Sequence, residues 1–147
     1  MMRRINRFLL LHADVKILLI KSWFLLAAIR LGLWILPFQK VRTLLVKNGR
    51  DSRFTKPPDQ KPILSVVWAI TRASRYVPSA TCLTQALALI VLLNGFGHQA
   101  HLRIGVTKGM DGRLEAHAWV EMGGKILLGD QGDLSRFRVL SPQTEIL

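Results

Sequence analysis

The chain has 147 residues, of which half are hydrophobic and 20% are charged, so its composition predicts one folded domain and excludes an intrinsically disordered chain. Its single cysteine, Cys82, excludes an intramolecular disulfide and is typical of a reducing, cytoplasmic environment. The net charge of +12 is uneven, because residues 1–61 hold 13 Lys/Arg against 3 Asp/Glu whereas residues 62–147 hold 8 against 6. The N-terminal part is therefore expected to meet an acidic peptide, an acidic protein face or anionic lipid.

The first 48 residues are predicted to be a basic, apolar helical region. Residues 6–31 lack Gly and Pro, and their apolar side chains occupy most of the helical wheel, which predicts a long helix. Gly32 and Pro37 mark its end or a kink, and residues 38–48 predict a short second helix. Since apolar area left in water is costly, the first helix is expected to dock onto the rest of the chain, a partner or a lipid surface.

Neither export nor a membrane span is favoured for this region. The basic start is followed by only a short apolar run, Phe8–Leu11, with no small-residue cleavage site. Lys16, Lys21 and Arg30 then divide the apolar stretch, so that no uncharged run approaches the roughly 18–20 residues that cross a bilayer. A buried helix, or a helix in peripheral contact with a membrane, fits the pattern better.

A linker separates this region from the rest of the chain. Residues 49–62 contain three prolines, one glycine and alternating charges. Helical spacing resumes over residues 63–77 and is broken at Pro78, and a further helix is predicted from Cys82 to Asn94-Gly95. The chain is accordingly divided into an N-terminal region (1–48), a linker (49–62) and a core (63–147).

After the last predicted helix the pattern changes to that of antiparallel strands. Gly123-Gly124 predicts a two-residue hairpin turn, because both positions of a type I′ turn need a positive φ. Helices followed by an antiparallel sheet indicate an α+β fold. The predicted cross-strand pairs of the hairpin are Met122–Lys125, Glu121–Ile126, Trp119–Leu128 and His117–Asp130.

Three residues of this core form a candidate Cys-His-Asp site. Cys82 lies at a predicted helix start, where Ser79 or Thr81 can act as N-cap, and where free N–H groups and the helix dipole would stabilise a thiolate or an oxyanion. Directly opposed strand residues have Cβ atoms roughly 4.5–5.5 Å apart, so the His117 imidazole could reach the Asp130 carboxylate. The set supplies a nucleophile, a general base and an orienting carboxylate.

Simpler explanations compete with this site. A lone cysteine in an apolar helix is often a small core residue, and a His–Asp pair across a hairpin is often a surface pair. Trp119 is expected to pack over the site, and Glu121 to be a solvated charge. Residues three apart on a strand point to opposite faces, which disfavours a zinc site. Such a zinc site would combine Cys82, His98, His101 and His117.

Several motifs together resemble a known family. Arg75 and Pro78 precede the cysteine, and an aspartate stands thirteen residues after the histidine. The other motifs are "LGLWILPF" near the N-terminus, "CLTQALAL" at 82–89, "LRIGV" at 102–106 and "AHAWVE" at 116–121. This combination resembles the leader peptidases of lasso peptide biosynthesis, which belong to the transglutaminase-like, papain-related cysteine proteases. The resemblance implies N-terminal helices followed by a papain- or transglutaminase-like core, with the nucleophile at a helix N-terminus packed on an antiparallel sheet.

The resemblance also implies roles and partners. The family's cysteine attacks the amide that joins leader to core peptide, its histidine transfers protons and its aspartate orients the histidine, and these roles carry over to Cys82, His117 and Asp130. No cofactor or metal is implied. The implied partners are the precursor peptide, a separate leader-binding protein and an ATP-dependent macrolactam cyclase. Gln85 stands where many relatives carry arginine, so no role is carried over to it.

Two other functions are compatible with the sequence. A transglutaminase-like acyltransferase would use the same triad, because only the second nucleophile, water or amine, differs. A basic module that binds a membrane or a partner through residues 1–61 would explain the charge there but would leave the Cys-His-Asp arrangement as coincidence. Nucleic acid is not an expected partner, since the chain has neither a helix-turn-helix pattern nor an aromatic and basic sheet motif.

Overall fold

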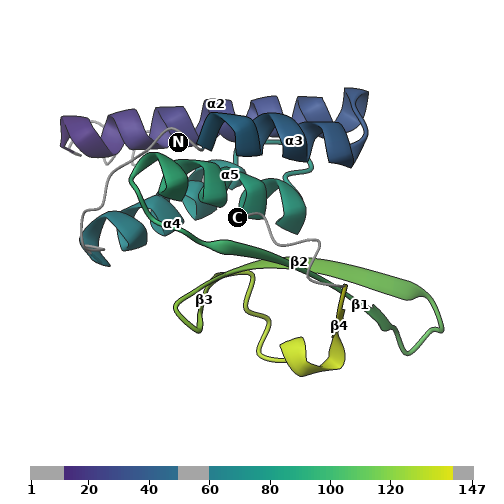
Figure 1. The fold of residues 1–147 in the computed structure, drawn as a ribbon. Helices are drawn as coiled ribbons and strands as arrows, with labels where there is room; N and C mark the ends of the chain where they lie inside the picture. Colours follow the sequence, from purple (N-terminus) through teal and green to yellow (C-terminus); the bar gives the residue numbers. More distant parts are fainter. Residues whose placement is uncertain (1–11, 50–59, 141–147) are drawn as a thin grey trace, which may run out of the picture.

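The computed structural model describes residues 12–49 and 60–140, which form four α-helices and a four-stranded antiparallel sheet (Figure 1). This architecture confirms the predicted α+β fold. The elements are α2 (Ala13–Ile35), α3 (Phe38–Gly49), α4 (Gln60–Ser74), α5 (Cys82–Gly95), β1 (His101–Lys108), β2 (Leu114–Met122), β3 (Lys125–Leu128), the 3₁₀ helix η1 (Leu134–Arg136) and β4 (Arg138–Val139).

The helices cover one face of the sheet, with α5 as the central element. Figure 1 shows α2 and α3 on the side of the molecule away from the sheet, and α5 between them and β2. α5 contacts α2 and α4 as well as the two longest strands, β1 and β2. Buried apolar side chains from the helices and from the sheet form one core, which includes Leu26 of α2, Ile70 of α4, Leu89 of α5 and Val120 of β2.

The first helix runs further along the chain than its sequence predicts. Residues 6–11 of the predicted helix lie outside the described residues. At the other end, α2 continues through Gly32 to Ile35, and it stops because Leu36 precedes a proline and is extended, with φ −114° and ψ 146°. Its buried residues, Ser22, Leu26 and Ile29, lie against α4 and α5, so α2 docks onto the rest of the chain.

The predicted linker is shorter at its C-terminal end. Residues 50–59 lie outside the described residues, and α4 begins at Gln60, three residues before the predicted start. Pro62 does not prevent this, because a proline in the first turn of a helix loses no intrahelical hydrogen bond. α5 spans Cys82–Gly95, as the sequence predicts.

The sheet has the strand order β3-β2-β1-β4. Gly123 and Gly124 form the predicted two-residue turn, with φ values of 56° and 76°, and the pairs Met122–Lys125 and Glu121–Ile126 are confirmed. The predicted pair Trp119–Leu128 is wrong. The register shifts between Val120 and Glu121, and Leu128 pairs with Val120 instead.

A β-bulge explains this shift. Leu127 is the extra residue of β3, since Leu128 and Ile126 pair with adjacent residues of β2. In a regular strand two consecutive side chains point to opposite faces. At the bulge both Leu127 and Leu128 pack against the hydrophobic core. Burial of two leucines in a row therefore accompanies the change in register.

Candidate active site

Helix α5 and the β2–β3 hairpin meet at a cavity of about 220 Å³. β3 pairs with β2 only from Val120 to Met122, so the preceding stretch of β2 is left without a strand partner on that side. The cavity opens next to this stretch. Its lining residues are Cys82, Gln85, His117, Ala118, Leu128 and Gly129. The fold thus brings the predicted nucleophile and the predicted base to one cavity, without a hydrogen bond between them.

Cys82 is the first residue of α5 and carries a half-buried, free thiol. The N-cap is Thr81, one of the two predicted candidates, whose hydroxyl oxygen accepts a hydrogen bond from Thr84 N at 3.4 Å. The other backbone N–H groups of the first helical turn, those of Cys82 and Leu83, have no carbonyl partner within the helix. They are therefore suited to hold a negative charge that forms beside the Cys82 sulfur.

Gln85 holds the segment that leads into the cysteine. It lies one helical turn after Cys82, where it lines the same cavity. Its Nε2 donates a hydrogen bond to the carbonyl of Ala80 at 3.2 Å. The neighbouring residue, Ser79, has a φ of 56°, an uncommon conformation for a residue other than glycine. Gln85 thus ties this constrained connection to the helix that carries the predicted nucleophile, a structural function that the sequence pattern leaves open.

The His117 ring is buried and its orientation is fixed by hydrogen bonds. Its Nε2 lies 2.7 Å from the carbonyl oxygen of Gly129. Because a carbonyl only accepts, Nε2 must carry the hydrogen, which leaves the lone pair on Nδ1. Gln131 Nε2 lies 3.5 Å from Nδ1. Nδ1 is therefore the nitrogen that can take a proton.

Asp130 does not pair with His117, and the predicted direct contact is wrong. Its exposed carboxylate instead accepts a hydrogen bond from Gly132 N at 2.8 Å. The reason is the backbone at Gly129, where φ is 89° and the chain turns away from β2. Asp130 therefore closes the turn that follows β3, while the preceding carbonyl meets the histidine. A catalytic contribution of Asp130 stays a prediction.

Gly129 is the residue that this close approach requires. A Cβ atom there would lie 2.8 Å from the carbonyl oxygen of Ala118 and 2.9 Å from Trp119 Cβ. Such distances are shorter than any ordinary carbon contact, and the positive φ disfavours a side chain as well. Gly129 is thus the group in contact with His117 that the sequence analysis missed. The signal available in the sequence was the Gly-Asp pair at the end of the strand, which marks a turn.

Trp119 packs against the His117 ring, as expected. The two rings are stacked with centroids 6.2 Å apart, and the Phe137 ring centroid lies 5.6 Å from that of the histidine. The indole Nε1 donates to Glu121 Oε1 at 2.8 Å, and Arg103 Nε donates to Glu121 Oε2 at 3.2 Å. Glu121 is therefore half-buried in a polar network, not the solvated charge that was expected, because Arg103 lies within reach on the neighbouring strand.

The arrangement suits nucleophilic acyl chemistry. It offers a thiol at a helix N-terminus, an imidazole with its lone pair on Nδ1, and helix N–H groups for an oxyanion. Within residues 12–49 and 60–140, no three His, Cys, Asp or Glu side chains gather as a set that could hold a metal ion.

Comparison with known families agrees with this chemistry. The family model of the transglutaminase-like superfamily matches residues 23–142, and the chain belongs to this superfamily, which includes cysteine proteases and acyltransferases. The matched range begins within α2 and contains the whole cavity. No curated protein and no solved structure matches the chain.

Proposed function

We propose that this transglutaminase-like chain is a cysteine endopeptidase that cleaves the leader from a ribosomally synthesised lasso precursor peptide before macrolactam formation. The observation that supports it most is the shared cavity of Cys82, at the start of α5, and His117, held by Gly129. The motifs around these residues, which resemble those of lasso leader peptidases, supply the substrate class.

The reaction would proceed by covalent catalysis. Cys82 Sγ attacks the carbonyl carbon of the amide between leader and core, and its proton passes to His117 Nδ1. The N–H groups of the first turn of α5 stabilise the oxyanion, and Gly129 O accepts from Nε2–H of the imidazolium. His117 then gives its proton to the leaving amine as the C–N bond breaks. A water molecule, deprotonated by His117, hydrolyses the thioester and frees the leader and the thiol.

Asp130 would act as a positioning residue in this scheme. Its carboxylate closes the turn from Asp130 to Gly132, and that turn presents the Gly129 carbonyl to His117. The Cys82, His117 and Asp130 assignments are thus retained, with the aspartate acting through the backbone instead of by direct contact.

The proposal includes partners and a location. The substrate would be delivered by a separate leader-binding protein, which makes the cut effectively intramolecular, and the product would pass to an ATP-dependent macrolactam cyclase. The basic residues Arg50, Arg53 and Lys56, outside the described residues, are the proposed contacts for the leader-binding protein. The single free cysteine suits action in the cytoplasm.

Mass spectrometry of the full-length protein with the precursor and its leader-binding protein tests this function. Cleavage should release a leader and a core peptide whose masses together equal that of the precursor plus one water. A leader that is instead joined to an added primary amine would indicate the acyltransferase. An intact precursor with wild-type protein, alongside a reactive Cys82 thiol, would contradict the peptidase.

A further inference from the structure

The outer face of α2 carries a continuous apolar stripe. Its residues recur at spacings of three and four, which places them on one side of the helix. All of them are exposed, and several are more than half exposed, as Phe24 is at 62%. The stripe consists of Ile17, Ile20, Phe24, Ala28, Leu31 and Ile35.

This stripe is not part of the protein core. The opposite side of α2 already supplies the buried contacts, through Ser22, Leu26 and Ile29. α2 is therefore apolar on two sides, and the chain covers one of them. By length and composition alone α2 could cross a membrane, and only 17% of its most apolar window is buried inside the protein, while the remainder is half-buried or exposed.

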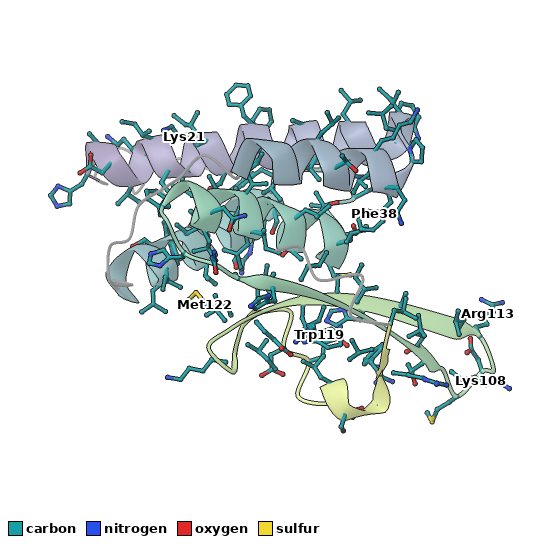
Figure 2. The ribbon with its side chains drawn as sticks, in the orientation of Figure 1. Lys21, Phe38, Lys108, Arg113, Trp119 and Met122 are labelled. Carbon is teal, nitrogen blue, oxygen red and sulfur yellow. The ribbon has the colours of Figure 1, made fainter. Side chains whose placement is uncertain are left out.

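Aromatic and basic side chains flank the stripe. Trp34 is 80% exposed, and Trp23 is 40% exposed with its indole N–H donating to the carbonyl of Tyr76. Lys21 lies beside the stripe, on the side of the molecule away from the sheet (Figure 2). Indole rings favour the boundary between water and hydrocarbon, and lysine side chains can extend to anionic headgroups.

We propose that the outer face of α2 docks on the surface of an anionic lipid bilayer, with the helix lying in the plane of the membrane. Charge complementarity selects this occupant, because the segment that contains α2 and α3 carries a net charge of +10 over residues 1–61. The stripe itself offers no hydrogen-bonding side chain that a specific protein partner would need to satisfy. An aliphatic and aromatic face with basic flanks is the pattern of interfacial helices.

The position of the active site is compatible with this docking. α2 and α3 form one side of the molecule and the sheet forms the other (Figure 1). Residues of α2 do not line the cavity that holds Cys82 and His117. The bound protein would hold its peptide site open to solvent. The proposal does not depend on the reaction that the site performs.

Vesicle sedimentation with the full-length protein tests the proposal. The probes are vesicles of phosphatidylcholine alone and vesicles that also contain phosphatidylserine. Wild-type protein should sediment with the anionic vesicles, and added salt should weaken this binding. The double variant Phe24→Ser/Leu31→Ser should lower the partition coefficient by about tenfold or more, since bound apolar area is lost. Lys21→Glu should weaken binding to the anionic vesicles only.

A matched control removes exposed apolar side chains elsewhere. Met110 and Leu114, at the β1–β2 turn, are 108% and 75% exposed, and Met110→Ser/Leu114→Ser should leave vesicle binding unchanged. A second measurement uses tryptophan fluorescence and a conservative substitution. The emission of the wild type should shift to the blue with anionic vesicles, and Trp34→Phe should reduce that shift.

Two results would overturn the proposal. One is wild-type protein that stays in the supernatant with anionic vesicles. The other is equal vesicle binding by Phe24→Ser/Leu31→Ser and by its control. The wild type could fail to bind vesicles while Phe24→Ser/Leu31→Ser lowers the oligomeric mass or abolishes binding of the leader-binding protein. In that case the stripe is a protein interface and not a lipid one.

Discussion

Helices α5 and α2 have the same kind of sequence and different surroundings. Both are apolar around nearly the whole helical wheel, which is the pattern of a helix buried on all sides. α5 fits that pattern, because α2 and α4 cover one side of it and the sheet covers the other. α2 is covered on one side only. A helix that is apolar on all sides is therefore expected to be covered on all sides. Whether the same chain supplies that cover depends on the fold, and for α2 it does so on one side only.

The largest effect is expected at the start of α5, where the covered helix carries the proposed nucleophile, Cys82. Cys82→Ala should lower the rate of peptide cleavage by about 10⁴-fold or more, because no other group can form the covalent intermediate. The unfolding free energy should change little. Leu31→Ala on the outer face of α2 is the control, and its cleavage rate in solution should equal that of the wild type. Cleavage assays and chemical denaturation of both variants measure these effects.

Well-folded Cys82→Ala that cleaves at the wild-type rate would end the peptidase interpretation. A Leu31→Ala variant that cleaves as slowly as Cys82→Ala would contradict the comparison, because the exposed face of α2 would then be needed for the structure of the active site.

Packing gives the next largest effect and tests the comparison directly. Leu89→Ala on α5 removes a fully buried side chain and should lower the unfolding free energy by about 2–5 kcal/mol. Leu26→Ala, on the buried side of α2, should cost a similar amount. Phe24→Ala, on the exposed side of the same helix, should stay within about 0.5 kcal/mol of the wild type. Comparable losses for Phe24→Ala and Leu26→Ala, measured by urea unfolding, would contradict one-sided burial of α2.

A smaller effect is expected where the hairpin completes the site beside α5. Gly129→Ala should slow cleavage by about tenfold or more, because the added Cβ collides with Ala118 and Trp119 and displaces the carbonyl that orients His117. Gly124→Ala is the matched control. It has a positive φ of 76° but no heavy atom within 4 Å of the added Cβ, so it pays about the same 1–2 kcal/mol of backbone strain without moving Gly129. Equal cleavage rates for the two variants would show that the Gly129 carbonyl is not needed to orient His117.

The smallest effects separate two roles of Asp130. Asp130→Asn keeps an oxygen that can accept from Gly132 N, so cleavage should fall by only about threefold, whereas Asp130→Ala should cost about tenfold. Asp133→Asn should be nearly silent, since Asp133 forms an exposed ion pair with Arg136. A severe loss in steady-state cleavage by Asp130→Asn would show that the carboxylate itself acts on His117.

Local signals in the sequence predicted the parts of the fold that depend on neighbours along the chain. The bounds of α5 follow from its N-cap and its terminal Asn-Gly pair, and the first two hairpin pairs follow from Gly123-Gly124. Local signals also placed Cys82 at a helix start and His117 on a strand, but their meeting at one site was inferred from the roles of a Cys-His-Asp set and from the family resemblance.

The parts that were missed depend on tertiary packing. The bulge opposite Val120–Glu121 exists because Leu127 and Leu128 both reach the core, and no local pattern records which residues the core will accept. The extra residue in β3 and the turn at Gly129 together separate His117 from Asp130. In the same way, Glu121 is half-buried because it pairs with Arg103 of the neighbouring strand. Helix α2 continues beyond Gly32 and ends only at the residue before Pro37.

The acceptor that orients His117 is an atom of the main chain, and this has a consequence for genetics. Every residue has a carbonyl, so no codon change can delete the Gly129 oxygen. A scan that replaces each side chain by alanine would reveal Cys82 and His117 through large losses, whereas at Gly129 and Asp130 it would report only the smaller losses that come from displacing this carbonyl. Selection acts on this contact solely through the shape of the backbone, and therefore on the residues that fix this shape, such as Gly129 and Asp130.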